Sequence, residues 1–298
     1  MSGTIVVGVD THEQARADAV ALGTALAAAL GAELLLAHVF PYEPLALGGV
    51  GPFPLAQESA EILALAERLA PPGTPSEARP STSPARGLHA LAQDVGADLL
   101  VVGSSHRGPL GRVFLGSHAE GVLSGAPCAV AVAPRGLATR GWELDEIAAA
   151  YDGSADASRG LARARRLADA VGARLRLFAV APLAPLEWSA YAYQPDWHSL
   201  QERRREDLER RLAEEADGAA TEVVLGDVVE ELRRLTERVD LLVLGSRAYG
   251  PIKRVVMGAT GHRVVREAAC PVLVVPRSAA DRDEGEEAEA DGEGAAAT

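Results

Sequence analysis

The sequence contains one domain twice, and this repeat constrains the fold more than any other feature. The segment VVGSSHRGPLGRVFLGS at 101–117 aligns without a gap with VLGSRAYGPIKRVVMGA at 243–259. The same offset of 142 residues separates Cys128 from Cys270. Two copies at this spacing account for a chain of 298 residues as two ordinary domains, each of which buries its own apolar segments.

Each copy alternates apolar runs with helical segments. In copy one the sequence predicts strands at 5–9, 33–39, 76–81, 98–103 and 128–134, and helices at 13–30, 55–70, 84–95 and 116–125. Continuous apolar strands that alternate with helices are typical of a parallel sheet covered on both faces, and right-handed crossovers make such a domain doubly wound. We therefore expect two α/β domains, each with a five-stranded, mostly parallel sheet, at 1–138 and 144–278, with a linker near 135–143.

Charge and composition narrow the classes of partner. Eight acids and one arginine lie in 279–298, which we expect to be a disordered, solvated tail, with a partner-binding tail as the alternative. The rest of the chain is mildly acidic and has no sustained basic stripe, which argues against nucleic acid as a partner. The Ala/Leu run at 19–32 is too short to cross a bilayer, and no basic segment opens a secretory signal. We expect a cytoplasmic protein with no membrane partner.

A glycine-containing stretch follows the strand predicted at 98–103. Open parallel sheets bind ligands beyond the carboxyl ends of their strands, so this stretch and Asp10, which follows the first strand, lie at the ligand-binding edge. Gly103 lets a ligand approach the backbone, and Gly116 and Ser117 start a helix whose free N–H groups favour an anion. The plain alternative is a strand, a turn and an N-capping Ser117. The Walker phosphate loop and the GxGxxG fingerprint are both absent from the sequence.

Both copies resemble the universal stress protein family, over about residues 3–138 and 144–278. In that family the first strand ends in Asp, often within Asp-Gly-Ser, and the second strand ends in a His-Val element, here His38 and Val39. Members that bind ATP carry Gly-x2-Gly-x9-Gly-Ser/Thr after the fourth strand. The corresponding positions are Gly103, His106, Gly116 and Ser117 in copy one, and Gly245, Ala248, Gly258 and Ala259 in copy two. The resemblance implies an adenine nucleotide alpha hydrolase-like, Rossmann-like fold.

The resemblance also implies adenine nucleotide sites. In copy one the implied nucleotide-binding residues are Asp10, Thr11, Val39, Gly103, His106, Arg107, Gly116, Ser117 and His118. A second, weaker site would comprise Asp152, Gly153, Ser154, Val180, Gly245, Gly258 and Thr260. By analogy with the family, Asp10 and Val39 would hold the adenosine end of ATP and the loop with Ser117 would hold the phosphates. Whether Mg²⁺ binds together with ATP is left open, because Asp10 is the one acid near the loop that could bind the metal.

Departures from the family motif rank the two copies. His106 replaces the second glycine in copy one, where it either contacts phosphate or blocks nucleotide entry. Copy two replaces that glycine by Ala248 and the hydroxyl by Ala259, with Thr260 displaced by one position. We therefore expect copy one to be the better ATP site.

The remaining candidates are weaker. Arg107 and Arg112 either add positive charge to an anion site or are ordinary surface residues. We expect His38 to be a structural histidine, and Cys128 and Cys270 to be buried small hydrophobic residues. The other histidines are too scattered to predict a metal site, and the two cysteines too distant for a disulfide framework. Three roles are open for the aromatic segment EWSAYAYQPDW at 187–197. It covers a cleft, it contacts a partner, or it packs on its own domain.

The resemblance implies a tandem universal stress protein that binds ATP and acts in the stress response through protein contacts. The family's closing strands pair across a dimer, so we expect CAVAVAP and CPVLVVP to pair between the copies, making one chain an intramolecular pseudo-dimer. Whether two chains also form a homodimer, and which protein the chain contacts, are left open. The alternatives are a nucleotide-free scaffold and a slow ATP hydrolase. No catalytic residue is assigned, because no positioned base or paired carboxylates accompany the loop.

Overall fold

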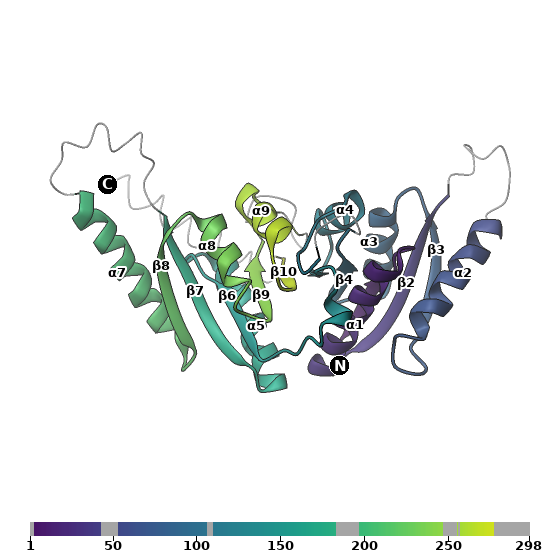
Figure 1. Ribbon diagram of the computed structural model, residues 1–298, viewed down its shortest axis with the longest axis horizontal. Helices are drawn as coiled ribbons and strands as arrows, with labels where there is room; N and C mark the ends of the chain where they lie inside the picture. Colours follow the sequence, from purple (N-terminus) through teal and green to yellow (C-terminus); the bar gives the residue numbers. More distant parts are fainter. Residues whose placement is uncertain are drawn as a thin grey trace, which may run out of the picture.

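One continuous sheet runs through the whole molecule (Figure 1). The computed structural model describes residues 3–42, 53–105, 110–182, 197–246, 255 and 257–276. Within these residues ten strands pair in the order β3-β2-β1-β4-β5-β10-β9-β6-β7-β8, so β3 and β8 form the two outer edges. None of the described helices is long and apolar enough to span a membrane.

Each copy supplies five strands, which match the predicted architecture. Copy one comprises β1 (Thr4–Gly8), α1 (Glu13–Leu30), β2 (Glu33–Pro41), α2 (Phe53–Glu67), β3 (Ser76–Ser81), α3 (Pro84–Asp94), β4 (Leu99–Gly103), α4 (Ser117–Leu123) and β5 (Ala129–Ala133). Copy two comprises β6 (Glu146–Ala150), α5 (Ala155–Val171), β7 (Arg174–Pro182), α7 (Trp197–Ala216), β8 (Ala220–Gly226), α8 (Val228–Leu235), β9 (Leu241–Gly245), α9 (Ala259–Glu267) and β10 (Val272–Val275). Within each copy the described strands pair in parallel.

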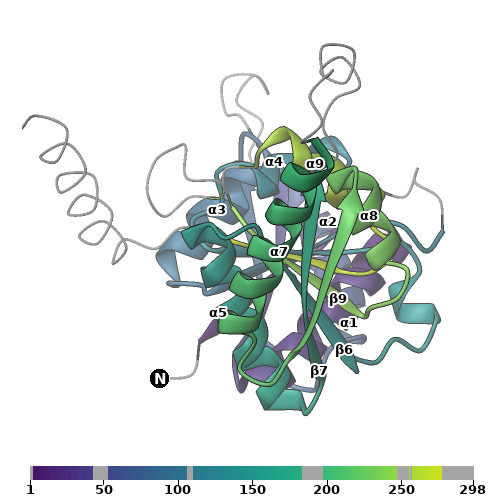
Figure 2. The same cartoon turned by 90° about the vertical axis from the view of Figure 1, so that its left-hand side faces the viewer.

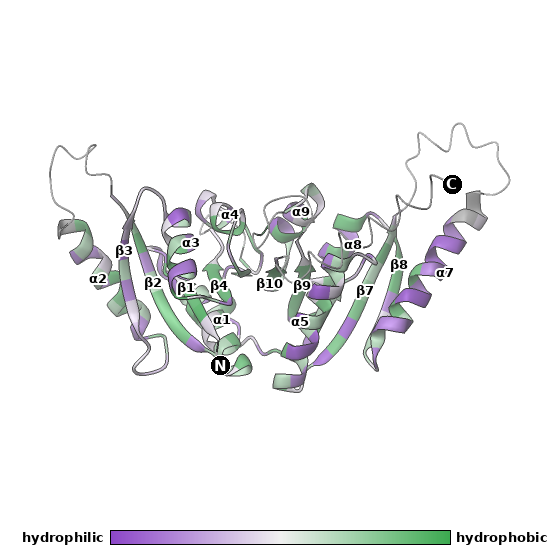
Figure 3. Cartoon of the chain, turned by 180° about the vertical axis from the view of Figure 1, so that it is seen from behind, coloured by the Kyte–Doolittle hydropathy of each residue, from purple (hydrophilic) through white to green (hydrophobic). Residues whose placement is uncertain are grey.

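Helices cover both faces of the sheet, because successive strand side chains point to opposite faces. On β4, Leu99 and Val101 pack into the core under α1, α2, α5 and α7, while Leu100 and Val102 pack into the core under α3, α4, α8 and α9. Figure 2 shows α7 and α8 on opposite sides of the strands of copy two. The strands are mostly hydrophobic, whereas α7, which contains ERRREDLERR, is mostly hydrophilic (Figure 3). This pattern fits a buried sheet with solvated outer helices.

The boundaries of the elements follow local chemistry. Gly31 ends α1 with a φ of 60°, and Gly172 ends α5 with a φ of 71°, a left-handed conformation that glycine adopts readily. The helix predicted at 116–125 is shorter, because Ser124 is extended and Gly125 has a φ of 85°. The acidic tail at 279–298 and all of the aromatic segment except Trp197 lie outside the described residues.

The two copies meet through their closing strands. β5 pairs antiparallel with β10, with Val130 opposite Val274 and Val132 opposite Val272. These residues are fully buried, so the junction is part of the core. The prediction that the closing strands pair within one chain is confirmed, and the chain is an intramolecular pseudo-dimer.

The linker is held against copy one by a buried carboxylate. Asp18, on α1, is 1% exposed, and its oxygens accept hydrogen bonds from the backbone N–H of Gly136 at 2.7 Å and of Ala138 at 2.9 Å. A short 3-10 helix, η1 (Leu137–Thr139), begins at this contact. Charged acceptors satisfy backbone donors strongly, so the segment between the copies is an ordered part of the fold.

Candidate functional site

Copy one has a cleft at the carboxyl ends of β1, β2 and β4. Its volume is about 240 Å³. The residues that line it are Gly8, Val9, Asp10, Thr11, Ala37, His38, Val39, Pro84, Leu88, Val102, Gly103, His118, Ala119 and Val122. β1 and β4 are parallel neighbours with Gly8 opposite Val102, so the residues that follow the two strands meet at one edge. Ligands of open α/β sheets bind at this kind of edge.

The turn after β1 fixes the first carboxylate. The Oδ1 atom of Asp10 accepts a hydrogen bond from the N–H of His12 at 2.8 Å. Arg16, which is buried, donates from Nη1 to the carbonyl oxygens of Asp10 at 3.2 Å and Thr11 at 3.0 Å. Both sides of the turn are therefore held in place. In copy two, Oδ1 of Asp152 accepts from the N–H of Ser154 at 3.0 Å, so the same turn recurs.

The glycine that ends the fourth strand of each copy has a packing role that the sequence did not indicate. A Cβ on Gly103 would lie 2.3 Å from the carbonyl oxygen of Ala15, and a Cβ on Gly245 would lie 2.1 Å from that of Asp156. Each strand end thus abuts the first turn of a helix, α1 or α5. Close approach of that helix, rather than of a ligand alone, accounts for these glycines.

Gly116 and Ser117 start α4 but are not among the residues that line the copy-one cleft. Gly116 is the N-cap and has no side-chain capping bond, so the alternative that Ser117 caps the helix is wrong. Of the nine predicted residues, five line the cleft: Asp10, Thr11, Val39, Gly103 and His118. His106 and Arg107 lie outside the described residues, as does Ala248 in copy two.

Copy two has the larger cleft. Its volume is about 320 Å³, and it lies at the carboxyl ends of β6, β7 and β9. Six of the seven predicted residues line it: Asp152, Ser154, Val180, Gly245, Gly258 and Thr260. Gly153 takes a φ of 83° in the turn and is not among them. The rest of the lining is mainly apolar: Ala150, Tyr151, Ala157, Phe178, Pro182, Val228, Leu232, Leu244, Met257, Gly261 and Val264, with Asp156 and Ser246.

Two serines that the sequence did not single out stand beside these clefts. Ser104 and Ser246 follow Gly103 and Gly245 and are 3% and 1% exposed, and among the described residues their hydroxyl oxygens have no hydrogen-bond partner. Buried polar groups normally have partners, so such hydroxyls call for an explanation. The signal was present as the Gly-Ser pair in both copies, but its burial could not be deduced without the sheet register.

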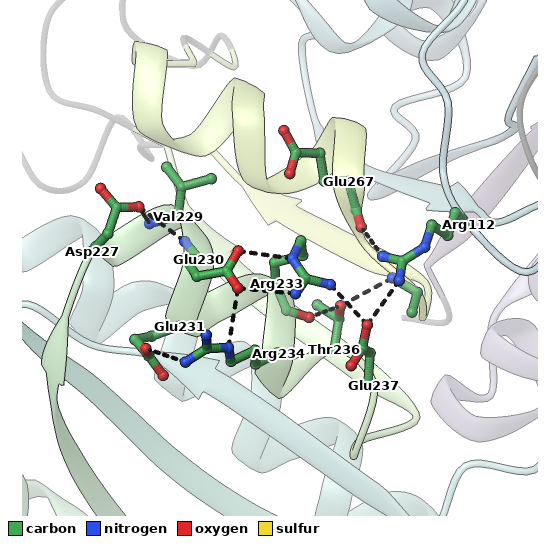
Figure 4. Close-up of polar contacts among 11 residues, drawn as sticks. Arg112, Asp227, Val229, Glu230, Glu231, Arg233, Arg234, Thr236, Glu237 and Glu267 are labelled. Carbon is green, nitrogen blue, oxygen red and sulfur yellow. Dashed lines mark hydrogen bonds and ion pairs between the residues drawn. The ribbon is translucent and has the colours of Figure 1, made fainter.

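Arg112 binds copy two instead of an anion in copy one (Figure 4). Its Nη2 atom lies 2.8 Å from a carboxylate oxygen of Glu237, and its Nη1 donates to the carbonyl oxygen of Glu267 at 3.1 Å. Glu237 also accepts from Arg233 on α8 at 2.8 Å. Arg112 does not line the copy-one cleft, and its ion pair at the junction of the copies is a role that neither prediction named.

His38 and the two cysteines lie in the core, where structural roles were predicted for them. The Nδ1 atom of buried His38 lies 2.7 Å from the carbonyl oxygen of Val9, which supports the structural interpretation. Cys128 and Cys270 are buried free cysteines, and burial raises the pKa of each thiol to about 12. Among the residues that the structure describes, no three His, Cys, Asp or Glu side chains group as metal ligands.

Comparison with known proteins shows which family the chain resembles. The model described as the universal stress protein family matches residues 1–134 and again 143–276. A universal stress protein of Mycobacterium tuberculosis is 26% identical over 206 residues, which cover 66% of this chain and 70% of that protein. A universal stress protein of Thermus aquaticus is 35% identical over 136 residues, which cover 43% of this chain and 96% of that protein.

A solved structure agrees with these matches at the level of the fold. The crystal structure of a universal stress protein from Archaeoglobus fulgidus covers 93% of this chain and 100% of that chain, with a TM-score of 0.60 and 16% identity. The pairing of two α/β copies, the recurring aspartate turn at each sheet edge and the double match to one family model agree. The chain therefore belongs to the universal stress protein family and contains two domains of that family in tandem.

Proposed function

We propose that the chain is a cytoplasmic regulatory module of the stress response that binds ATP in copy one and acts through protein contacts. One observation carries this proposal. The copy-one cleft gathers Asp10 and Thr11 after β1, Val39 on β2, and Gly103 and His118 around the end of β4. These residues come from four separate parts of the sequence, and they meet at the edge where open α/β sheets bind nucleotides.

The lining residues favour copy one for an anionic ligand. Among its described lining residues, Asp10 is the single carboxylate, and His38 and His118 also line the cleft. The described lining of copy two includes Asp152, together with Asp156, which is ion-paired with Arg159, and no Lys, Arg or His. A histidine N–H can donate a hydrogen bond to an anion, so copy one suits a triphosphate better than copy two. We infer that Asp10 and Val39 hold the adenosine end, with the phosphates extending toward Gly116 and Ser117.

Hydrolysis is the weaker alternative. Asp10 is the one acid among the described residues that line the copy-one cleft, and it accepts a hydrogen bond from His12 in the turn. A phosphoryl-transfer site needs a positioned base and usually metal-binding acids, so any turnover of ATP here would be slow. A nucleotide-free scaffold is the other alternative, in which His106 would block entry to the cleft.

Binding of ATP and a matched pair of glycine variants test the proposal. Purified protein is denatured, released nucleotide is identified by mass spectrometry, and binding of added ATP is measured by calorimetry. We expect about one ATP per chain, lost in Gly116→Val, whose branched side chain would crowd Ser105, 3.1 Å from a Cβ at this position. Gly258→Val makes the same change in copy two and should retain binding.

Each other outcome points to an alternative. If no nucleotide is released and added ATP does not bind, the chain is a scaffold and the proposal is wrong. ATP hydrolysis by the native chain well above that of Gly116→Val would instead establish an enzyme. Loss of binding in Gly258→Val alone would move the site to copy two.

A further inference from the structure

The segment that leads into α4 of copy one, residues 110–116 (the pre-α4 segment), is tied to copy two by a charged side chain. Arg112 forms an ion pair with Glu237, in which Nη2 lies 2.8 Å from a carboxylate oxygen, and it also donates to the carbonyl oxygen of Glu267 (Figure 4). Glu237 in turn accepts from Arg233 on α8 at 2.8 Å. Hydrogen bonds from Arg112 and Arg233 hold the pKa of the Glu237 carboxyl below its ordinary value. This carboxylate therefore joins the pre-α4 segment to α8.

Two further contacts fix the pre-α4 segment against copy two. The backbone N–H of Val113 donates to the carbonyl oxygen of Ala268 at 2.7 Å, and the Val113 side chain is buried in the core. The guanidinium of Arg266, on α9, lies over the ring of Phe114 at 5.9 Å from its centroid, within the range of a cation–π contact. Three successive residues of the segment are thus held by the other copy.

The helix α4 is itself held from the same side. Glu120, in its first turn, has Oε1 at 3.0 Å from Nε2 of His262 on α9. Accordingly, α4 and α9 lie side by side in both Figure 1 and Figure 2. The two residues are 142 positions apart, so an exact dimer of one copy would place two identical side chains at this contact. The pairing of an acid with a histidine exists because the two copies differ.

The charged contacts to the pre-α4 segment run in one direction. The residues of copy one that correspond to Glu237 and Arg266 are Val95 and Ser124, 142 positions earlier. Neither carries a charge, so copy one cannot offer the same ion pair or cation–π contact to the corresponding segment of copy two. Copy two therefore supports copy one through side chains that copy one lacks.

We propose that copy two is the positioning half of the copy-one ATP site, in which Glu237 and Arg266 fix the pre-α4 segment and thereby the start of α4. This inference rests on the proposed function for the ligand of copy one, whose phosphates extend toward Gly116 and Ser117, where the segment meets the helix. A ligand binds more tightly to a segment that is already ordered, because less conformational entropy is lost on binding. Glu237 and Arg266 are positioning residues, since neither lines the copy-one cleft.

Glu237→Gln in the full chain tests the ion pair, with Glu231→Gln as the matched control. Glu231, on α8, pairs with Arg234 rather than with the pre-α4 segment. We expect Glu237→Gln to weaken ATP binding, measured by calorimetry, by about two- to fivefold, the range that follows from losing one half-exposed ion pair. Glu231→Gln should leave ATP affinity unchanged. Adding Arg266→Ala to Glu237→Gln should weaken binding by about twofold or more again, because the cation–π contact is lost as well.

Two readouts separate positioning from a general effect on folding. Hydrogen exchange of peptides from the pre-α4 segment should be faster in ligand-free Glu237→Gln than in the native chain, while exchange in the strands of copy one stays the same. By reciprocity, ATP should slow exchange at 266–269 of copy two in the native chain. The exchanged pair, Arg112→Glu with Glu237→Arg, should bind ATP more tightly than either single variant, because opposite charges face each other again.

The outcomes separate this inference from the proposed function. If the native chain binds ATP and Glu237→Gln binds it equally well, or if the pre-α4 segment of that variant exchanges at the native rate, the inference is wrong and the proposed function stands. An equal loss of affinity in Glu231→Gln would also overturn the inference, because it would show a general effect of α8. If the native chain binds no ATP, the proposed function is wrong and the inference falls with it.

Discussion

Cys128 and Cys270 occupy equivalent positions, one just before β5 and the other two residues before β10, where the two copies join. Both are buried, and the Sγ atom of Cys270 contacts the carbonyl oxygen of Pro271 at 3.3 Å. Burial raises the pKa of each thiol to about 12, because a thiolate is poorly solvated in the core. These residues act as small core side chains, and their chemistry depends on whether the chain is folded.

The thiols should be inert in the native chain. At pH 8 we expect a thiol reagent such as Ellman's reagent to label folded protein about a hundredfold or more slowly than unfolded protein. Because unfolded thiols ionise near pH 8.5 and folded ones do not, the free energy of unfolding should fall as pH rises above about 8.5. Cys128→Ala with Cys270→Ala should remove that part of the pH dependence. Rapid labelling at full native structure would contradict the buried environment.

At the scale of elements, α1 holds both the sheet and the linker. Its first turn abuts Gly103 at the end of β4, and its buried Asp18 accepts hydrogen bonds from Gly136 and Ala138. Position 160, the equivalent of Asp18 in copy two, is Gly160, so this contact is specific to copy one. One side chain of the helix that precedes β2 therefore holds the start of the linker, while Arg140 and Trp142 hold its later part through the carbonyl oxygens of Ala269 and Asp240.

Asp18→Ala should destabilise the chain by about 2 to 3 kcal/mol, because two backbone donors lose a charged acceptor in a buried position. The free energy of unfolding, measured by urea denaturation with circular dichroism, checks this value. Asp18→Asn keeps one acceptor oxygen and should cost less. As a control, Asp227→Ala removes an exposed N-cap of α8 and should cost only about 1 kcal/mol. Equal effects of Asp18→Ala and Asp227→Ala would argue against a special role of the linker contact.

Some features of the helices and strands could be predicted from the sequence, and others could not. The predicted bounds of α1 and β3 match the structure, because glycine caps and short loops mark them locally. The end of α4 was placed too late, since Gly125 takes a left-handed conformation that the sequence pattern did not separate from helix. Gly103 was assigned to ligand approach, and its contact with Ala15 depends on helix packing that no local pattern encodes.

At the scale of the whole molecule, β5 and β10 turn two domains into one sheet. The N–H of Val113 donates to Ala268 at 2.7 Å, and the N–H of Val255 donates to Ala126 at 2.9 Å. These two bonds join equivalent positions, since each residue of one pair lies 142 positions from its counterpart in the other. The junction thus has approximate two-fold symmetry, although Arg112 and Glu237 add a charged contact.

One copy produced without the other should not remain monomeric. Residues 1–138 alone would expose β5 as an apolar edge strand, and such edges pair with other chains. We expect this fragment to form a dimer or larger species in sedimentation experiments, while the full chain, whose β5 is covered by β10, does not use this edge. Val130→Lys in the fragment should reduce association, with circular dichroism confirming that it is folded. A folded fragment that remains monomeric at high concentration would contradict the prediction.

The sequence by itself determined the repeat, the alternation of strands and helices, the family and the aspartate at each sheet edge, because these depend on local periodicity and spacing. Tertiary structure alone decided that the copy-two cleft is larger than that of copy one, that Arg112 contacts Glu237, and that the hydroxyls of Ser104 and Ser246 are buried with no partner within the part of the chain that the structure describes. Each of these facts joins residues from separate strands and helices. Their distances are set by sheet register and helix packing, which depend on the whole core at once.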